Sequence, residues 1–139
     1  IRWIVRCAQM ARSRIKAIFQ WDIKKVWEVV TSLENYEWRS DLSKIEVVND
    51  KTFIEYTKDG YQTTFTITRQ EPFARWEFDM DNDNMHGHWV GIFTAREGVT
   101  EIDFTEEVTA KKLLLKPFVK GYLKKQQERY IADLEKALQ

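Results

Sequence analysis

The chain has 139 residues, which is the size of a single domain and enough to bury a core without disulfide bonds. Basic and acidic side chains both number 22, so no overall charge favours nucleic acid as a partner. Cys7 is the only cysteine, which excludes an intrachain disulfide and favours a reducing compartment, the cytoplasm.

The first residues of the sequence give little information about function. The sequence opens on Ile1 instead of methionine, and no segment has the charge pattern of a signal peptide. No apolar run approaches the roughly 18 residues of a transmembrane helix. We treat residues 1–12 as an N-terminal extension whose origin stays open, and residues 13–139 as one domain.

A strand and two short helices are expected next. The segment "SRIKAIFQ", from Ser13, alternates apolar and polar residues, which is typical of a half-buried strand. Asp22 then stands where the N-cap of a helix is expected. The apolar stripe of this helix consists of Ile23, Val26, Trp27 and Val30. The following "LENYEWRSDLS" is expected to form the second short helix, with Tyr36 and Trp38 as its large side chains.

Six strand-like segments follow between about Lys44 and Thr109. They are rich in valine, isoleucine, threonine and aromatic residues, which favour strands. The segments are "KIEVVND", "KTFIEYTK", "YQTTFTITRQ", "RWEFDMD", "HGHWVGIFTARE" and "TEIDFTEEVTA". The connections between them are short and rich in turn residues, so neighbouring strands are expected to be antiparallel.

The C-terminal segment is predicted to form one long helix. Pro117 suits the first turn of a helix, and a helix from there to the end would be about 30 Å long. The stripe at helical spacing consists of Leu115, Val119, Tyr122, Gln126, Tyr130 and Leu134. This stripe has to be buried, so we expect the helix to pack on the concave face of the curved sheet. A cavity is expected along the seam between them.

Several short motifs occur in a characteristic order between residues 13 and 139. They are "VW", "YEWRSDL", "WEFDM", "MHGHWVGIF", "GVTEIDFTEEV" and "QQERYIADLEKAL". Their order resembles that of the START-like (SRPBCC, helix-grip) superfamily, in its polyketide cyclase/dehydrase-like branch. This resemblance implies an α+β helix-grip fold, in which a curved antiparallel sheet of about seven strands wraps around a long C-terminal helix. It also implies a hydrophobic ligand cavity, but no single reaction, because the superfamily includes carriers, hormone receptors, cyclases and chaperone regulators.

Three aspartates in "DMDNDNMHGHWV" suggest a calcium loop at first sight. Asp79, Asp81 and Asp83 match the spacing of the first ligands of such a loop. The sixth position, however, is Asn84 instead of glycine, and the twelfth is Val90 instead of glutamate. We therefore interpret the segment as the polar face of a strand that ends in a turn.

Both histidines of the chain lie in the next strand. His86 and His88 project to the same side, but a metal site would need a third ligand, for which Asp103 is a candidate. The opposite side carries Trp89 and Phe93, and we expect this aromatic side to face the cavity. Both histidines are then on the outer surface, and no metal site is predicted.

The last predicted strand carries the most interesting acidic residue. In "EIDFTEEV", Glu106 shares a face with Ile102 and Phe104, and we expect this face to be the inner one. Burial would raise its pKa, and Arg69 and Tyr61 are candidate partners. The alternatives are that Glu106 reaches solvent at the cavity mouth or forms a structural ion pair.

A basic segment covers the start of the C-terminal helix. Six lysines and no acidic residue occur from Lys111 to Gln127. Such a segment is compatible with an anionic membrane or another polyanion as a partner. We interpret it as a solvated helix face.

These observations predict a protein that binds a hydrophobic or aromatic small molecule. The residues predicted to contact this ligand are Trp76, Phe78, Met80, Trp89, Phe93, Phe104, Glu106, Tyr122, Gln126 and Tyr130, with Glu106 and Gln126 as the polar contacts. The alternatives are a cyclase or dehydratase with Glu106 as general acid or base, and a module that binds a protein through the outer sheet face or the basic helix. No cofactor is expected, because no phosphate-binding loop occurs. A homodimer is a further alternative that the sequence leaves open.

Overall fold

The structure, a computed structural model, describes residues 10–139; Cys7 and the rest of residues 1–9 lie outside the described residues. The elements in chain order are β1 (Met10–Phe19), α2 (Ile23–Thr31), β2 (Leu42–Val47), β3 (Thr52–Thr57), β4 (Gln62–Glu71), β5 (Arg75–Asp81), β6 (Met85–Arg96), β7 (Val99–Ala110), the short 3-10 helix η1 (Leu113–Leu115) and α3 (Lys116–Leu138).

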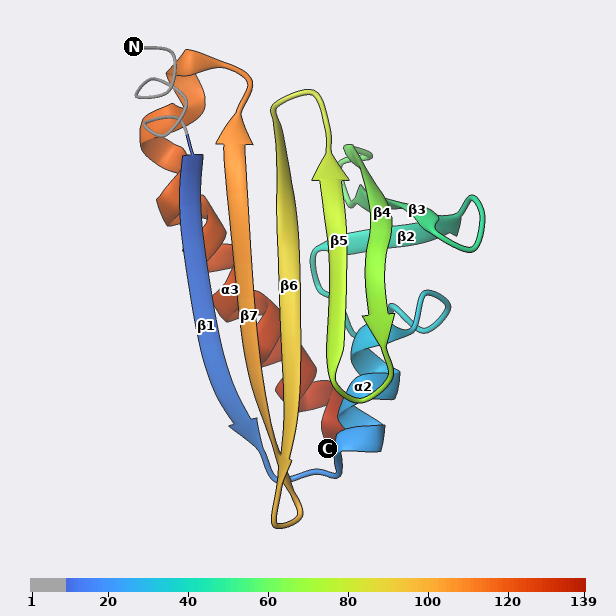
Figure 1. Ribbon diagram of the computed structural model, residues 1–139. Helices are drawn as coiled ribbons and strands as arrows, with labels where there is room; N and C mark the ends of the chain where they lie inside the picture. Colours follow the sequence, from blue (N-terminus) through green and yellow to red (C-terminus); the bar gives the residue numbers. More distant parts are fainter. Residues whose placement is uncertain (1–9) are drawn as a thin grey trace.

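The strands form one antiparallel sheet of seven strands in the order β1-β7-β6-β5-β4-β3-β2. Short turns connect the strands from β2 to β7 in chain order. The first strand, β1, pairs with the last, β7, along the whole length of β1. Figure 1 shows α3 running diagonally along one face of this sheet, with α2 at the end where α3 finishes. The predicted helix-grip fold, with a long C-terminal helix on a curved sheet, is confirmed.

The prediction of a second short helix is wrong. Residues 32–41 form turns and bends between α2 and β2. Local bonds compete with a helix there: the Asn35 amide donates to Ser32 Oγ (3.0 Å), and Trp38 Nε1 donates to the Asn35 carbonyl (3.0 Å). The Trp38 ring also packs edge-on against Tyr130, 5.2 Å away, so a tertiary contact holds the segment.

The boundaries of the other elements lie close to their expected positions. β1 begins at Met10, three residues before the expected Ser13, so residues 10–12 belong to the sheet. Asp22 occupies the N-cap of α2, although its carboxylate makes no capping hydrogen bond. Pro117 lies in the first turn of α3, as predicted. No helix in the described part of the chain has both the length and the apolar character needed to cross a membrane.

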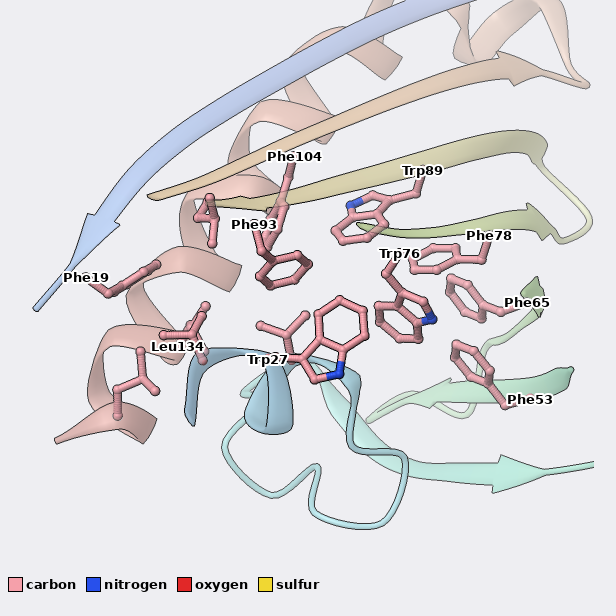
Figure 2. Packing of buried hydrophobic residues seen from close by; sticks show 14 residues of the cluster. Phe19, Trp27, Phe53, Phe65, Trp76, Phe78, Trp89, Phe93, Phe104 and Leu134 are labelled. Carbon is pink, nitrogen blue, oxygen red and sulfur yellow. The ribbon is translucent and has the colours of Figure 1, made fainter. Parts of the chain in front are cut away.

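Aromatic rings fill most of the space between the sheet and the helices (Figure 2). At the end covered by α2, Trp27 packs edge-on against Phe93 with ring centres 4.9 Å apart. Ile102 of β7 and Leu134 of α3 are completely buried there. Beyond this filled end, the sheet and α3 enclose open space further along the sheet.

Candidate functional site

A cavity of ≈ 200 Å³ lies between the concave face of the sheet and α3. Its walls come mainly from β3 to β7, from the segment between α2 and β2, and from α3. For comparison, an apolar cavity of about 150 Å³ holds a benzene molecule. The space therefore suits a molecule of one or two rings or a short branched chain.

The sheet side of the cavity is a continuous aromatic surface. Period-two alternation brings one ring from every second residue onto the concave face. The rings are those of Phe53, Phe65, Trp76, Phe78, Trp89 and Phe104. Phe53 stacks on Phe65 with centres 4.9 Å apart, and Phe78 stacks on Trp89 at 4.7 Å. The rings hold one another in place, so the surface is formed before any ligand arrives.

Glycine makes room for the largest of these rings. A Cβ atom at Gly91 would overlap the Trp89 indole, lying 2.7 Å from its Cζ3 atom and 3.2 Å from Cδ1 of Phe104. A Cβ atom at Gly87 would likewise collide with the Glu107 carbonyl and lie 2.9 Å from Cγ2 of Val108. The Gly-x-Trp-x-Gly alternation of β6 thus lets the indole lie flat along its own strand.

Most of the residues predicted to contact a ligand lie around this cavity. Those that line it are Trp76, Phe78, Met80, Trp89, Phe104, Glu106, Tyr122, Gln126 and Tyr130. Phe93 is the exception, because it lies four residues beyond Trp89 on β6, or roughly 13 Å further along the strand. It packs against Trp27 and Phe104 in the filled core instead. Contact between the lining residues and a ligand stays a prediction.

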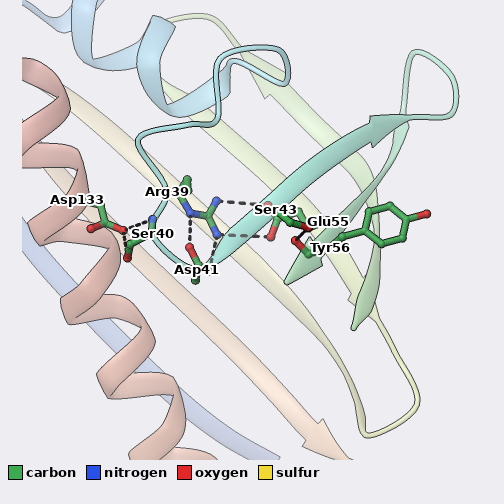
Figure 3. A network of polar contacts seen from close by, with 7 residues as sticks. All are labelled: Arg39, Ser40, Asp41, Ser43, Glu55, Tyr56 and Asp133. Atoms are coloured by element: carbon green, nitrogen blue, oxygen red, sulfur yellow. Dashed lines mark hydrogen bonds and ion pairs between the residues drawn. The ribbon is translucent and has the colours of Figure 1, made fainter. Parts of the chain in front are cut away.

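The polar end of the cavity is built around Arg39, which sequence reasoning missed (Figure 3). Its guanidinium donates to both carboxylate oxygens of Asp41, each at 3.1 Å, and to those of Glu55 at 3.3 and 3.4 Å. It also lies over the ring of Tyr130, 4.9 Å from the ring centre. We define Arg39, Asp41, Glu55 and Glu106 as the charged cluster of the cavity.

The loop that carries Arg39 is anchored to α3. Asp133 accepts hydrogen bonds from the backbone N–H and from the hydroxyl of Ser40, both at 2.8 Å. Arg39 was missed because its segment was expected to be a helix. Glu55, in contrast, carried a usable signal, since it lies two residues after the buried Phe53 and therefore on the same strand face.

Burial and neighbouring charge act against each other within the charged cluster. Burial opposes the charge of Arg39, but the carboxylates of Glu55 and Asp41 outweigh it and raise the Arg39 pKa. Burial also raises the pKa of Glu55, although Arg39 pulls it down. One guanidinium thus serves two carboxylates, so Arg39 has no charge left to balance that of Glu106.

Glu106 is the unpaired member of the cluster. Burial raises its pKa to about 7, the charge of Glu55 adds to the rise, and Arg39 opposes it. Among residues 10–139 it has no hydrogen-bond or ion-pair partner within the ordinary limits. Its side chain lines the cavity, as predicted, and near neutral pH it is present in both protonation states.

The partners predicted for Glu106 are wrong. A β-bulge between Ile67 and Arg69 turns the Arg69 side chain away from the inner face. Arg69 pairs instead with Glu71 at 2.6 Å and with Glu77 at 3.5 Å, on the outer surface. Tyr61 lies in the exposed turn before β4 and makes no hydrogen bond to Glu106 within the described range.

A neighbouring glutamine has a structural role. Gln127 is buried and lines the cavity, but Ser13 Oγ donates to its Oε1 at 2.7 Å, and its Nε2 donates to the Ser13 carbonyl at 3.0 Å. These bonds attach α3 to β1. Gln126, the predicted polar contact, lines the cavity without such bonds among the residues that the structure describes.

The histidines lie on the outer side of the sheet. His88 is held between two carboxylates, with Nδ1 2.6 Å from Asp79 Oδ1 and Nε2 3.0 Å from Glu77 Oε1. Burial opposes the protonation of His88, but these hydrogen bonds outweigh it and raise its pKa. Both ring nitrogens are thus engaged by acceptors. In residues 10–139 no cluster of histidine, cysteine and acidic side chains has the arrangement of a metal site.

The aspartates of the apparent calcium loop point to separate partners. Asp79 binds His88, while Asp81 forms an ion pair with Lys111 Nζ at 2.8 Å. The Asn82 side chain accepts from the amides of Asn84 and Met85 and closes the turn. This arrangement is a structured β-turn, in agreement with the interpretation of the sequence.

Comparison with known proteins identifies the family to which this architecture belongs. Residues 10–139 match the family model described as "Polyketide cyclase / dehydrase and lipid transport". The chain belongs to this family. The matched range includes every strand of the sheet, α3 and the whole lining of the cavity.

Solved structures of the same fold come from several bacteria. A conserved protein from Geobacillus kaustophilus has a TM-score of 0.80 at 10% identity, covering 92% of this chain and 95% of the other. The Zhui aromatase/cyclase from Streptomyces sp. R1128 has a TM-score of 0.79 at 10% identity, with 93% of each chain covered. A START superfamily protein from Mycobacterium smegmatis has a TM-score of 0.77 at 11% identity, covering 93% and 96%. No curated protein sequence matches the chain.

Proposed function

We propose that this protein binds a small hydrophobic or aromatic molecule in the cavity between the sheet and α3. The observation that carries the proposal is an open space with aromatic walls at the centre of the fold. A side-chain-lined cavity of this kind is the usual form of a small-molecule site. Membership in a family described by polyketide cyclisation and lipid transport supports it, as does the structural similarity to an aromatase/cyclase.

The charges of the cavity favour a neutral ligand. Arg39 is already engaged by Asp41 and Glu55, so an anionic group at the polar end would meet Glu106, and the one lining cation without an ion pair in residues 10–139 is the exposed Arg129. A neutral molecule avoids this repulsion. Protonated Glu106 can donate a hydrogen bond to a carbonyl oxygen, and ionised Glu106 can accept one from a hydroxyl group. The ligand we propose therefore carries one or two apolar rings and a hydroxyl or carbonyl group.

Ligand binding is tested with 2-naphthol as a probe, through quenching of tryptophan fluorescence. Trp89→Ala removes the ring that stacks on Phe78 and should weaken binding by roughly fivefold, because aromatic contacts are worth about 1 kcal/mol beyond burial. Trp21→Ala is the matched control, since Trp21 lies outside the cavity and is partly exposed. Equal weakening by both substitutions, or by neither, would contradict the assignment.

The native ligand is sought in the same preparation. Native mass spectrometry of freshly purified protein should show a bound molecule of roughly 100–200 daltons, in line with the size of the cavity. We expect the addition of 2-naphthol to displace it. An extra mass that survives a saturating amount of the probe would place that molecule outside the cavity.

An enzymatic role is the second candidate, and the state of Glu106 favours it. A half-buried carboxylate with a pKa near 7 and no partner among residues 10–139 can both take up and release a proton under physiological conditions. In an aldol cyclisation it would remove a proton from a carbon next to a carbonyl group. That carbon would attack a second carbonyl, and the proton would return to the new alkoxide.

Glu106→Gln separates this candidate from simple binding. The amide keeps the size of the side chain but cannot take up a proton at neutral pH. Turnover of a short diketone substrate should fall by at least about a hundredfold, within the range of general acid–base catalysis, while 2-naphthol binding persists. Unchanged turnover in this variant would remove Glu106 from the reaction.

A further inference from the structure

A group of exposed apolar side chains lies where the sheet ends and α3 begins. Leu113 and Leu114 of η1 are 73% and 87% exposed, and Phe118 and Tyr122 of α3 are 70% and 51% exposed. We call these four residues the apolar patch. Contiguous apolar groups of this kind on a protein surface mark an interaction site more often than single exposed residues do.

The geometry of α3 separates this patch from the core. Phe118 and Tyr122 are spaced i and i+4, so they lie on one side of the helix. Val119 and Leu123 follow them by one position, lie on another side of the helix and are buried against β7. In Figure 1 this part of α3 lies beside the end of β7, at the opposite end of the helix from α2.

The patch is surrounded by lysines. Lys111 is neutralised by Asp81, and Lys112 Nζ donates to the side-chain oxygen of Asn84 at 3.1 Å. Lys116, Lys120 and Lys125 are exposed, and within residues 10–139 they form no ion pair. The surface therefore combines protruding apolar groups with free positive charge.

The patch is continuous with the cavity. Tyr122 belongs to both, since it is half exposed and also lines the cavity. Arg129, which follows Tyr122 on the same side of α3 at i+7, is a lining residue too. A molecule that leaves the surface next to Tyr122 would thus be at the rim of the cavity.

We propose that the apolar patch and its lysines dock this protein onto an anionic lipid surface. Leu114 and Phe118 would enter the boundary between headgroups and acyl chains, while the lysines contact anionic headgroups. The proposal stands apart from the ligand of the cavity, because docking requires none.

Charge argues against the other possible occupants of this surface. A second copy of the chain, related by a two-fold axis, would bring the same lysines face to face. Residues 1–9 contain Arg2 and Arg6 and no acidic residue, so their charge does not complement that of the lysines. An anionic lipid surface is the partner that complements both the apolar groups and the charge.

The test is co-sedimentation of the whole chain with vesicles, without added ligand. Binding to vesicles of phosphatidylcholine mixed with phosphatidylglycerol is expected, and binding to phosphatidylcholine alone should be far weaker. Leu114→Ser with Phe118→Ser should weaken binding by roughly a hundredfold, through loss of buried apolar area. Lys116→Glu with Lys120→Glu should weaken it by at least roughly thirtyfold.

A matched control makes the same charge change elsewhere. Lys24→Glu with Lys51→Glu alters exposed lysines on α2 and on the turn before β3, and should leave vesicle binding within about twofold. Equal binding to neutral and anionic vesicles would overturn the proposal, as would equal losses in the control and the Lys116/Lys120 variant.

Two further measurements distinguish an anionic lipid surface from the other possible occupants of the apolar patch. If analytical ultracentrifugation shows a dimer that Leu114→Ser with Phe118→Ser converts to monomer, the patch is an interface between copies and the proposal fails. If vesicle binding appears only after removal of residues 1–9, that segment covers the patch in the whole chain, and the proposal fails as well. Unchanged thermal unfolding of the variants would show that these exposed positions do not support the core.

Discussion

The aromatic end and the polar end of the cavity are built in opposite ways. At the aromatic end, every ring stands on a regular strand and is supported by several neighbouring rings, as Trp89 is by Phe78 and Phe104. At the polar end, a single guanidinium from an irregular loop, that of Arg39, serves the carboxylates of Asp41 in the same loop and of Glu55 on β3. The aromatic end is therefore redundant, whereas the polar end depends on one residue.

This contrast has an energetic consequence. Each buried ring contributes to the free energy of unfolding in proportion to its own buried area, so removing one ring leaves the contribution of the others in place. A buried ion pair contributes little net stability, yet removal of one partner leaves an uncompensated buried charge. The stability of the polar end thus requires Arg39, Asp41 and Glu55 together, and the following predictions test this requirement.

Arg39→Ala is expected to have the largest effect. It leaves Asp41 and Glu55 without their counterion and should lower the free energy of unfolding by about 3–5 kcal/mol. Urea denaturation measures this loss. Adding Glu55→Gln to Arg39→Ala should recover part of it, because one uncompensated carboxylate is then absent.

Arg14→Ala is the control for this prediction. Arg14 also makes two hydrogen bonds to a carboxylate, that of Asp103 at 2.8 and 2.6 Å, but its side chain is 53% exposed. Its loss should cost at most about 1 kcal/mol. Similar losses for the two arginines would mean that the polar end does not depend on Arg39.

The pH dependence of Glu106 is expected to give the second largest effect. Its pKa is raised from the ordinary 4.5 to about 7 in the folded chain, so between these values the folded state holds more protons than the unfolded state. The free energy of unfolding therefore falls as pH rises through this window. Below it, Glu106→Gln and wild type should be equally stable; above it, the variant should be more stable, by up to about 3 kcal/mol.

Urea denaturation of both proteins at pH values from about 4 to 8 checks this expectation. The difference between the two stability curves isolates Glu106 from Glu55, whose own pKa is also raised by burial. A constant difference across the whole range would mean that Glu106 has an ordinary pKa in the folded chain.

Gly91→Ala should have the smallest effect of the three and tests the aromatic end. The new methyl group would meet the Trp89 ring, 2.7 Å from Cζ3, and the ring would have to shift. Overpacking of this kind costs about 1–3 kcal/mol. Binding of 2-naphthol should weaken at the same time, because the indole would move into the cavity.

Gly121→Ala provides the matched control for Gly91→Ala. A Cβ atom at Gly121 meets nothing within 4 Å, and the position lies within α3. The substitution should therefore stabilise the protein by about 1 kcal/mol through helix propensity. Destabilisation by Gly121→Ala and none by Gly91→Ala would refute the proposed role of glycine in seating Trp89.

The two ends also differ in how far the sequence predicts them. The alternation in β5 places Trp76, Phe78 and Met80 on one face, and this face is the one that lines the cavity. The alternation in β7 likewise brings Glu106 inward. These predictions depend only on the period of an extended chain, which is a local property of the backbone.

Local rules fail where the backbone is irregular. A single extra residue before Arg69 reverses the face on which that side chain lies, and nothing in "TITRQ" marks the bulge. The segment around Arg39 looks helical in sequence, yet its contacts with Tyr130 and Glu55 hold it in turns. Phe93 has the correct face but lies too far along β6 to reach the cavity.

The sequence by itself determined the order of the strands, the long C-terminal helix and the aromatic inner face, because each follows from a period or a turn signal within a short stretch of chain. Only the tertiary structure decided which of the inward residues surround open space, and which arginine meets the buried carboxylates. Those outcomes depend on the curvature of the whole sheet and on contacts between residues far apart in the chain, such as Ser40 with Asp133 and Arg39 with Glu55. Such contacts form only when the helix, the loop and the sheet are packed together.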